Sequence, residues 1–468
     1  MFVATKSNHH FFLQDWHVFY WLYSWGWKSA IRGDNWGWVL EFTPAFFGAG
    51  MLSGMNASWS FMLGAAMAWG LIGPLSVQTG VTHGKVSKIE PLRVRYTGMN
   101  DGSPRVFLLW IGVSIMLFYS ISELAVSGPA IYRAMRGVVV DLYRKAARKE
   151  ALEETDEFND PVPKDKQVQG WAWGGGLLIS SAVTILVCSL QFHMNAGNVV
   201  LALVLAFIFA FIGVSSSGTT DTNPVGTVAK MSQLVVGGAL KAEGKTGASA
   251  QLENLLAGSI ASSAAGHAVD MLGDLKTGHL VRASPRSQFY AQLFGSVFAV
   301  PFSVGMYVVF TKAYPCVVDG ALFDEGDCQF GAPAVAAWRY VALAVTTPNA
   351  IPFVSGMVAI GMGIFSALVP IFKHFFVPKS KQHFVPNFNA VGLGFVLPQT
   401  YYPLAMVIGA TGSMIWARRS LRHWDTFCYV LAAGMIVGEG LGGVMNAVLQ
   451  IAGVSGDVYG STVALPPW

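Results

Sequence analysis

The chain has 468 residues, of which 53% are hydrophobic and only 12% are charged, and its net charge is +4. A soluble domain carries roughly a quarter charged residues, so this composition excludes a soluble globular protein and indicates a membrane protein. The basic residues are spread over short loops, so the charge predicts no nucleic-acid partner. The 52 glycines and 15 tryptophans fit this class, because small residues let membrane helices approach closely and Trp gathers at membrane interfaces.

Residues 1–35 form an aromatic N-terminal segment. Its apolar part, residues 11–27, holds Gln14, Asp15 and His17. It is too short and too polar for a span of about 20 residues, so we predict an interfacial helix or a half-helix. The segment after Met1 lacks the apolar core of a signal peptide, so the spans themselves are expected to direct insertion.

Residues 36–132 are expected to form the first part of a membrane bundle, with spans at about 38–55, 57–76 and 106–123. Gly50 and Gly54 have the four-residue spacing of a helix-packing face. Residues 133–169 follow as a hydrophilic segment with eight Lys and Arg residues. The positive-inside rule places this charged loop in the cytosol.

Residues 170–468 are expected to form the second part of the bundle. Its apolar segments lie at about 171–190, 196–215, 225–240, 252–272, 289–310, 332–345, 351–372, 392–416 and 427–451. Two of them, 225–240 and 332–345, suit a short span or a half-helix equally well. The chain is thus predicted to be an all-α polytopic membrane protein with about ten or eleven spans, because period-2 alternation is absent and lipid requires an internally bonded backbone. Pro and Gly break several spans, which is typical of transporters whose site lies near the midplane.

Cys316 and Cys328 enclose an acidic run within the loop of residues 312–331, which is predicted to be extracellular or lumenal. A disulfide between them fits that compartment, and two unrelated thiols are the alternative. The sequence predicts neither a metal site nor a cofactor. It contains no GxSxG, Walker or HExxH motif, so we expect no enzyme.

Asp270 and Asp274 are four residues apart, on one face of a helix at the end of a predicted span. They either cap the helix and pair with Lys276, or take up a proton or contact a cationic substrate. Desolvation raises the proton affinity of a carboxylate, which suits the second alternative.

Further candidates for a substrate or proton pathway lie where apolar segments break or carry an isolated polar residue. Each has a structural alternative, namely a turn, a packed kink or a bond to an Arg or a backbone group. Arg286 suits either an anchor for a substrate carboxylate or a loop anchor. The pathway candidates are Asp221, Asn223, Gln399, Tyr401 and Glu439.

The run DMLGDLKTGHLVRASPRSQF, residues 270–289, resembles the hallmark segment of the oligopeptide transporter superfamily, and its yellow-stripe-like branch more than its peptide branch. The runs TDTNPVGTVAK and GMIVGEGLGGVMNAVLQIAGV support the resemblance, which extends from about Trp36 to Gly453. It implies a carrier in the plasma membrane or an endomembrane. Such a carrier moves small oligopeptides or peptide-like metal chelates together with protons, by alternating access. Lipid is an expected partner, and homo-oligomerisation is left open.

Members of this family usually carry several further spans before the region that matches Trp36. We therefore expect this chain to lack those N-terminal spans. One alternative to a carrier is a truncated, non-transporting scaffold or partner subunit. A channel is the other, although isolated acids and kinked spans do not favour it.

Overall fold

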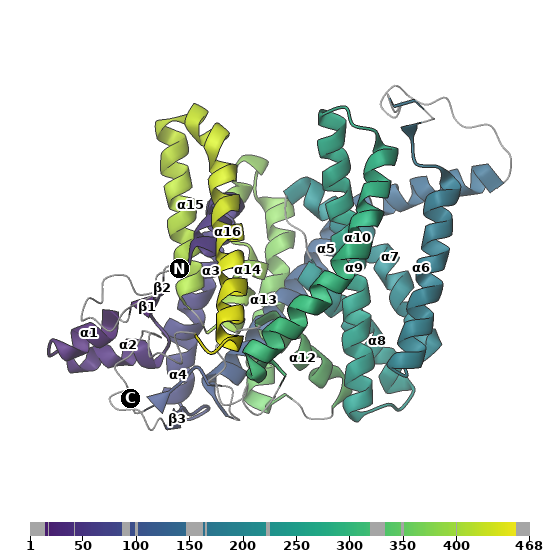
Figure 1. Ribbon diagram of the computed structural model, residues 1–468. Helices are drawn as coiled ribbons and strands as arrows, with labels where there is room; N and C mark the ends of the chain where they lie inside the picture. The colour runs from purple at the N-terminus through teal and green to yellow at the C-terminus, as the bar shows by residue number, and fades with distance from the viewer. Residues whose placement is uncertain are drawn as a thin grey trace. The chain divides into compact units, whose positions relative to one another are not determined.

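The computed structural model describes residues 15–16, 18–41, 43–86, 94–98, 102–146, 162–163, 166–220, 225–318, 333–347, 351–398 and 400–454. Most of them are helical (Figure 1). The strands among them form two short antiparallel pairs, β1 (Asp15–Trp16) with β2 (Leu40–Glu41) and β3 (Lys85–Val86) with β4 (Val94–Arg95). The predicted all-α class is confirmed.

Six segments of the described helices are long and apolar enough to cross a membrane: Pro44–Gln78, Pro104–Glu123, Gly170–Gln191, Pro285–Ala313, Phe353–Phe376 and Leu421–Ile451. The protein is therefore an integral membrane protein of the polytopic class. The predicted segments 196–215, 225–240, 252–272 and 332–345 are also helical in the structure, and 392–416 is divided into two helices.

The chain divides into two compact units, which we describe separately. Unit 1 comprises residues 1–120, 304–333 and 351–468, and unit 2 comprises residues 121–303 and 334–350. The described helices of unit 1 are α1 (Val18–Ser24), α2 (Ile31–Asn35), α3 (Pro44–Ala65), α4 (Gly73–Gln78), the first part of α5 (Pro104–Ala146), α13 (Phe353–Phe376), α14 (Phe388–Val396), α15 (Tyr401–Arg419) and α16 (Leu421–Ile451).

Helix α3 packs against α14, α15 and α16 in unit 1. Glycines bring the backbones together: a Cβ atom on Gly50 would lie 2.1 Å from the carbonyl oxygen of Met406, and one on Gly64 would lie 2.1 Å from that of Val391. Helices in lipid associate through such close packing because apolar burial does not distinguish a neighbouring helix from lipid. Any side chain at these two positions would push the helices apart.

Gly54 has a different role from the one predicted. Its φ of 75° and ψ of −176° break α3 at the point where two spans were expected to meet, and no described atom outside the neighbouring residues of α3 lies within 4 Å of the position that a Cβ atom would take there. Glycine tolerates this left-handed conformation because it has no Cβ atom. The predicted packing face is thus correct at Gly50 and wrong at Gly54, because four-residue spacing indicates packing only while the helix is continuous.

Serine hydroxyls connect α5 and α13 in unit 1. The Oγ of Ser114 donates to the carbonyl oxygen of Ala359 at 2.7 Å, and the Oγ of Ser366 donates to that of Ile115 at 3.0 Å. Small hydroxyl residues give such bonds without separating the two backbones.

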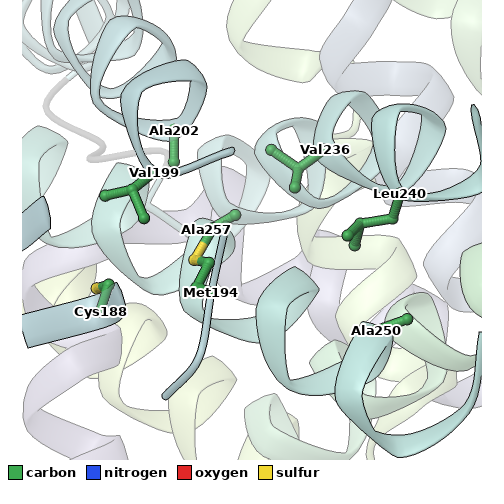
Figure 2. Close-up of a cluster of buried hydrophobic side chains, with 8 residues drawn as sticks. All are labelled: Cys188, Met194, Val199, Ala202, Val236, Leu240, Ala250 and Ala257. Atoms are coloured by element: carbon green, nitrogen blue, oxygen red, sulfur yellow. The ribbon is translucent and has the colours of Figure 1, made fainter. Parts of the chain in front are cut away.

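The described helices of unit 2 are the rest of α5, α6 (Gly170–Gln191), α7 (Ala196–Thr220), α8 (Val225–Ala242), α9 (Gly247–Leu280), most of α10 (Pro285–Ala313) and α12 (Pro333–Thr346). Helix α9 packs against α7 and α8. Figure 2 shows part of their core, where Ala250 and Ala257 of α9 lie fully buried with Val199 and Ala202 of α7 and Val236 of α8. This packing fixes which face of α9 is turned away from its neighbours.

Candidate functional site

A polar stripe on α9 is the main candidate site of unit 2. It consists of Ser263, His267, Asp270 and Asp274, whose spacings of four, three and four residues place them on one face of the helix. All four side chains are exposed. The opposite face carries small residues such as Ala261 and Ala265, which are fully buried against α7 and α8. Helix packing therefore directs the polar face outward.

A pocket of about 220 Å³ lies at the stripe. It is lined by Val225 at the start of α8 and, on α9, by Ser262, Ser263, Gly266, His267 and Asp270. Gly266 leaves open space in the pocket because it has no side chain; a Cβ atom built there would lie 3.8 Å from a methyl carbon of Val225. The pocket thus presents hydroxyl, imidazole and carboxylate groups over a surface of small residues. Such a set of groups can accept a polar or cationic ligand.

Asp274 continues the stripe toward the turn between α9 and α10. Gln288 Nε2 donates to its carbonyl oxygen at 2.9 Å, and Gln292 Nε2 donates to its carboxylate. Gly278 makes room for Gln288, since a Cβ on Gly278 would lie 2.1 to 2.2 Å from the amide group of that side chain. Glutamines of α10 are therefore the described partners of Asp274, in place of the ion pair with Lys276 that was one of the alternatives.

The conspicuous basic end of the family-like segment forms the α9–α10 turn. Arg282 has a φ of 60°, and Ser284 donates to the carbonyl oxygen of Lys166 at 3.2 Å. Arg286 lies in the first turn of α10 with an exposed side chain, and it is not among the residues that line the pocket. Pro285 begins α10, where its missing N–H costs no hydrogen bond.

Two other candidates lie in unit 1, near the start of α3. The backbone N–H of Ala45 donates to Glu439 Oε2 of α16 at 2.7 Å. The ring of Tyr402 stacks on that of Phe46, with 4.1 Å between the ring centroids, and its centroid lies 4.4 Å from that of Tyr401. Glu439 is half-buried and satisfies a backbone donor that a helix N-terminus leaves unpaired. This contact with a backbone group is one of the alternatives that its sequence position left open.

The structure therefore places Asp270 and Asp274 on one helix and brings Glu439 to the start of α3, whereas Tyr401 lies beside Tyr402, the residue that stacks on Phe46. Asp221, Asn223 and Gln399 lie outside the described residues, and so does the predicted pairing of Cys316 with Cys328. The two cysteines identified as free, Cys188 and Cys428, are both buried.

Sequence reasoning missed His267 and Glu253. The signal for His267 was its position one turn before Asp270. Glu253 is buried at the start of α9, where its carboxylate accepts from Lys245 Nζ at 2.7 Å and from Asn198 Nδ2 at 3.2 Å. The hydrogen bond to Glu253 raises the pKa of Lys245, which also lies 3.4 Å from Glu243. This cluster stabilises the α8–α9 turn.

Comparison with known proteins identifies the same family that the sequence of residues 270–289, at the α9–α10 turn, resembles. The profile described as OPT oligopeptide transporter protein matches residues 12–450. The chain is 24% identical to the Saccharomyces cerevisiae protein named "Putative oligopeptide transporter YGL114W", over 88% of this chain and 59% of that protein. It is 23% identical to the Arabidopsis thaliana protein named "Probable metal-nicotianamine transporter YSL5", over 95% of this chain and 63% of that one.

The Arabidopsis thaliana protein named "Metal-nicotianamine transporter YSL1" is 25% identical, over 88% of this chain and 59% of its own length. The chain thus spans about three fifths of the length of these relatives. Because the family profile covers nearly the whole of it, the chain belongs to the oligopeptide transporter family.

Proposed function

We propose that this chain forms the substrate-handling part of a secondary active transporter, which carries small oligopeptides or peptide-like metal chelates together with protons. The polar stripe of α9 carries the proposal. In a membrane protein, ionisable residues on an exposed face of a helix indicate a water-filled pathway, because lipid would penalise them. The family and the names of the relatives support the substrate classes.

Asp270 is the group that we assign to the proton. It lies in the pocket beside the proposed substrate position, and no described residue forms a hydrogen bond or an ion pair with it. Protonation would leave a neutral carboxylic acid, which crosses a region of low dielectric at a much lower cost than a carboxylate does. Alternating access would then expose the pocket to each side of the membrane in turn, with the proton and the substrate moving together.

Uptake by cells that express the chain tests this proposal. Labelled tetrapeptide and a labelled iron–nicotianamine chelate are compared at about pH 5 and about pH 7.5, so that the proton gradient across the membrane differs between the two conditions. We expect acid-stimulated uptake of one substrate, and we expect Asp270→Asn to remove the stimulation. Asp425→Asn is the matched control, because Asp425 is an exposed acid on α16 that is absent from the pocket.

Surface labelling must show that each variant reaches the membrane in equal amount. Uptake that is independent of pH in the unmodified chain would refute the proton coupling. No uptake of either substrate by chain that has reached the membrane would refute the assignment of transport to this chain by itself.

A further inference from the structure

His267 is a titratable residue of the pocket to which the proposed proton pathway assigns no role. It lies one turn from Asp270 on the same face of α9, and both side chains line the pocket. Neither has a hydrogen-bond or ion-pair partner within the part of the chain that the structure describes. An imidazole or a carboxylate that keeps its lone pairs available is able to bind a metal ion, and this pocket holds one of each.

The pair differs from a resident metal site. The described residues contain no group of three or more His, Cys, Asp or Glu side chains that could hold a metal ion. A bare transition-metal ion usually takes four or more ligands, so two side chains hold it poorly. A metal that arrives inside a chelator already carries most of its ligands. One or two coordination positions on the metal are then enough for a protein side chain to recognise it.

The size of the pocket agrees with this role. Its volume of about 220 Å³ is smaller than the roughly 300 to 1,000 Å³ that encloses a drug-sized ligand. It can therefore receive the metal end of a chelate while the organic part extends along the stripe. Gly266, between His267 and the start of α8, leaves the space that such a coordination sphere needs.

We propose that His267 binds the metal of a peptide-like chelate directly, through one imidazole nitrogen that replaces a weakly held ligand such as water, while Asp270 beside it keeps the proton. This inference rests on the proposed transport function and narrows it, because it makes the metal ion the recognised feature. An oligopeptide without metal offers no such contact. His267 is then a residue that determines specificity for chelates.

The experiment uses the full chain in lipid nanodiscs and copper(II)–nicotianamine as the probe. Pulsed electron paramagnetic resonance detects an imidazole nitrogen bound to copper, and a titration gives the affinity. We expect the imidazole signal in the unmodified chain and its loss in His267→Gln, together with at least a roughly tenfold weaker affinity. His279→Gln is the matched control, because His279 is an exposed histidine on another face of α9, outside the pocket.

A second variant, Gly266→Leu, keeps the test valid if His267→Gln folds poorly. It fills the pocket without removing a ligand, so it should also abolish the imidazole signal. The chelate binding without that signal, or an equal signal in His267→Gln, would overturn the metal contact and leave transport in place. Binding of tetrapeptide but not of chelate would overturn it too. Failure to bind either substrate would overturn both the metal contact and the proposed function.

Discussion

Replacing Gly50 with alanine should destabilise unit 1, and the structure gives the size of the effect. The new Cβ atom would lie 2.1 Å from the carbonyl oxygen of Met406 and 2.8 Å from its Cα. Both are backbone atoms, so α15 would have to retreat by roughly 0.9 Å to restore a separation of 3.0 Å. Overpacking of this kind costs up to about 3 kcal/mol, and the better helix propensity of alanine returns about 1 kcal/mol. The net loss is about 2 kcal/mol.

The assay is thermal unfolding of the detergent-solubilised protein, followed by fluorescence-detected gel filtration. A loss of about 2 kcal/mol lowers the apparent Tm by about 4 °C in a unit of this size. Gly442→Ala is the matched control on α16, where no described atom outside the neighbouring residues of that helix lies within 4 Å of the added Cβ atom, so its Tm should stay the same or rise by up to about 2 °C. The reasoning is refuted if the two variants melt at the same temperature.

Three further predictions test other parts of the chain. Glu253→Gln should lower the free energy of unfolding by about 1 kcal/mol at neutral pH. This loss should fade above about pH 10.4, because the raised pKa of Lys245 stabilises the fold only while the lysine is protonated. A difference in Tm that persists at high pH would contradict this prediction. Glu439→Ala should lower the apparent Tm by about 2 °C, because α3 loses its cap. Glu439→Gln should lower the Tm less, because the amide oxygen still accepts the hydrogen bond. Equal decreases in Tm would argue against a cap. Ser263→Cys should react with a charged thiol reagent, whereas Phe298→Cys should not, because Phe298 is exposed among apolar residues of α10. Both positions lie roughly 25 Å along the helices from the α9–α10 turn, so their depth is similar. Equal labelling of the two variants would show that the stripe has no special access to water.

Hydropathy and helix breakers predicted much of the fold. Helix α3 breaks at Gly54, close to where two predicted spans meet, and the turn between α9 and α10 lies between the predicted segments 252–272 and 289–310. Helix α9 nevertheless continues to Leu280, two turns beyond the predicted end of its span at about residue 272. Hydropathy locates the apolar part of a helix, whereas the hydrogen-bonded helix continues through polar residues until the backbone turns at Arg282.

Glycine spacing was a weaker guide, because it shows where a helix can be approached and not what approaches it. In α16, Gly434, Gly438 and Gly442 have the four-residue spacing of a packing face, yet no described atom outside the neighbouring residues of that helix lies within 4 Å of a Cβ at any of them. Gly438, Gly440 and Gly443 of the same helix match the letters GxGxxG, but they lie within α16 and not between a strand and a helix, so they do not indicate a nucleotide site.

The candidate site was predictable only in part, because its partners are distant in sequence. Helical spacing was enough to place Asp270 and Asp274 on one face. Spacing could not reveal that glutamines of α10 bind Asp274 or that Glu439 caps a helix 394 residues away. His267 was visible as the residue one turn before Asp270, but its importance depends on the pocket, which exists only once α8 packs beside α9.

The packing of α9 constrains how a transport cycle can use the stripe. An ionised Asp facing hydrocarbon costs roughly 2.5 to 3.5 kcal/mol, so two of them would cost about as much as the net stability of many proteins. Rotating α9 to hide them would push carboxylates into the interface where Ala261 and Ala265 are fully buried against α7 and α8. Close-packed helices have no room for that change. We therefore infer that α9 keeps its orientation, and that in the proposed transport cycle the surfaces that face the stripe are the ones that move.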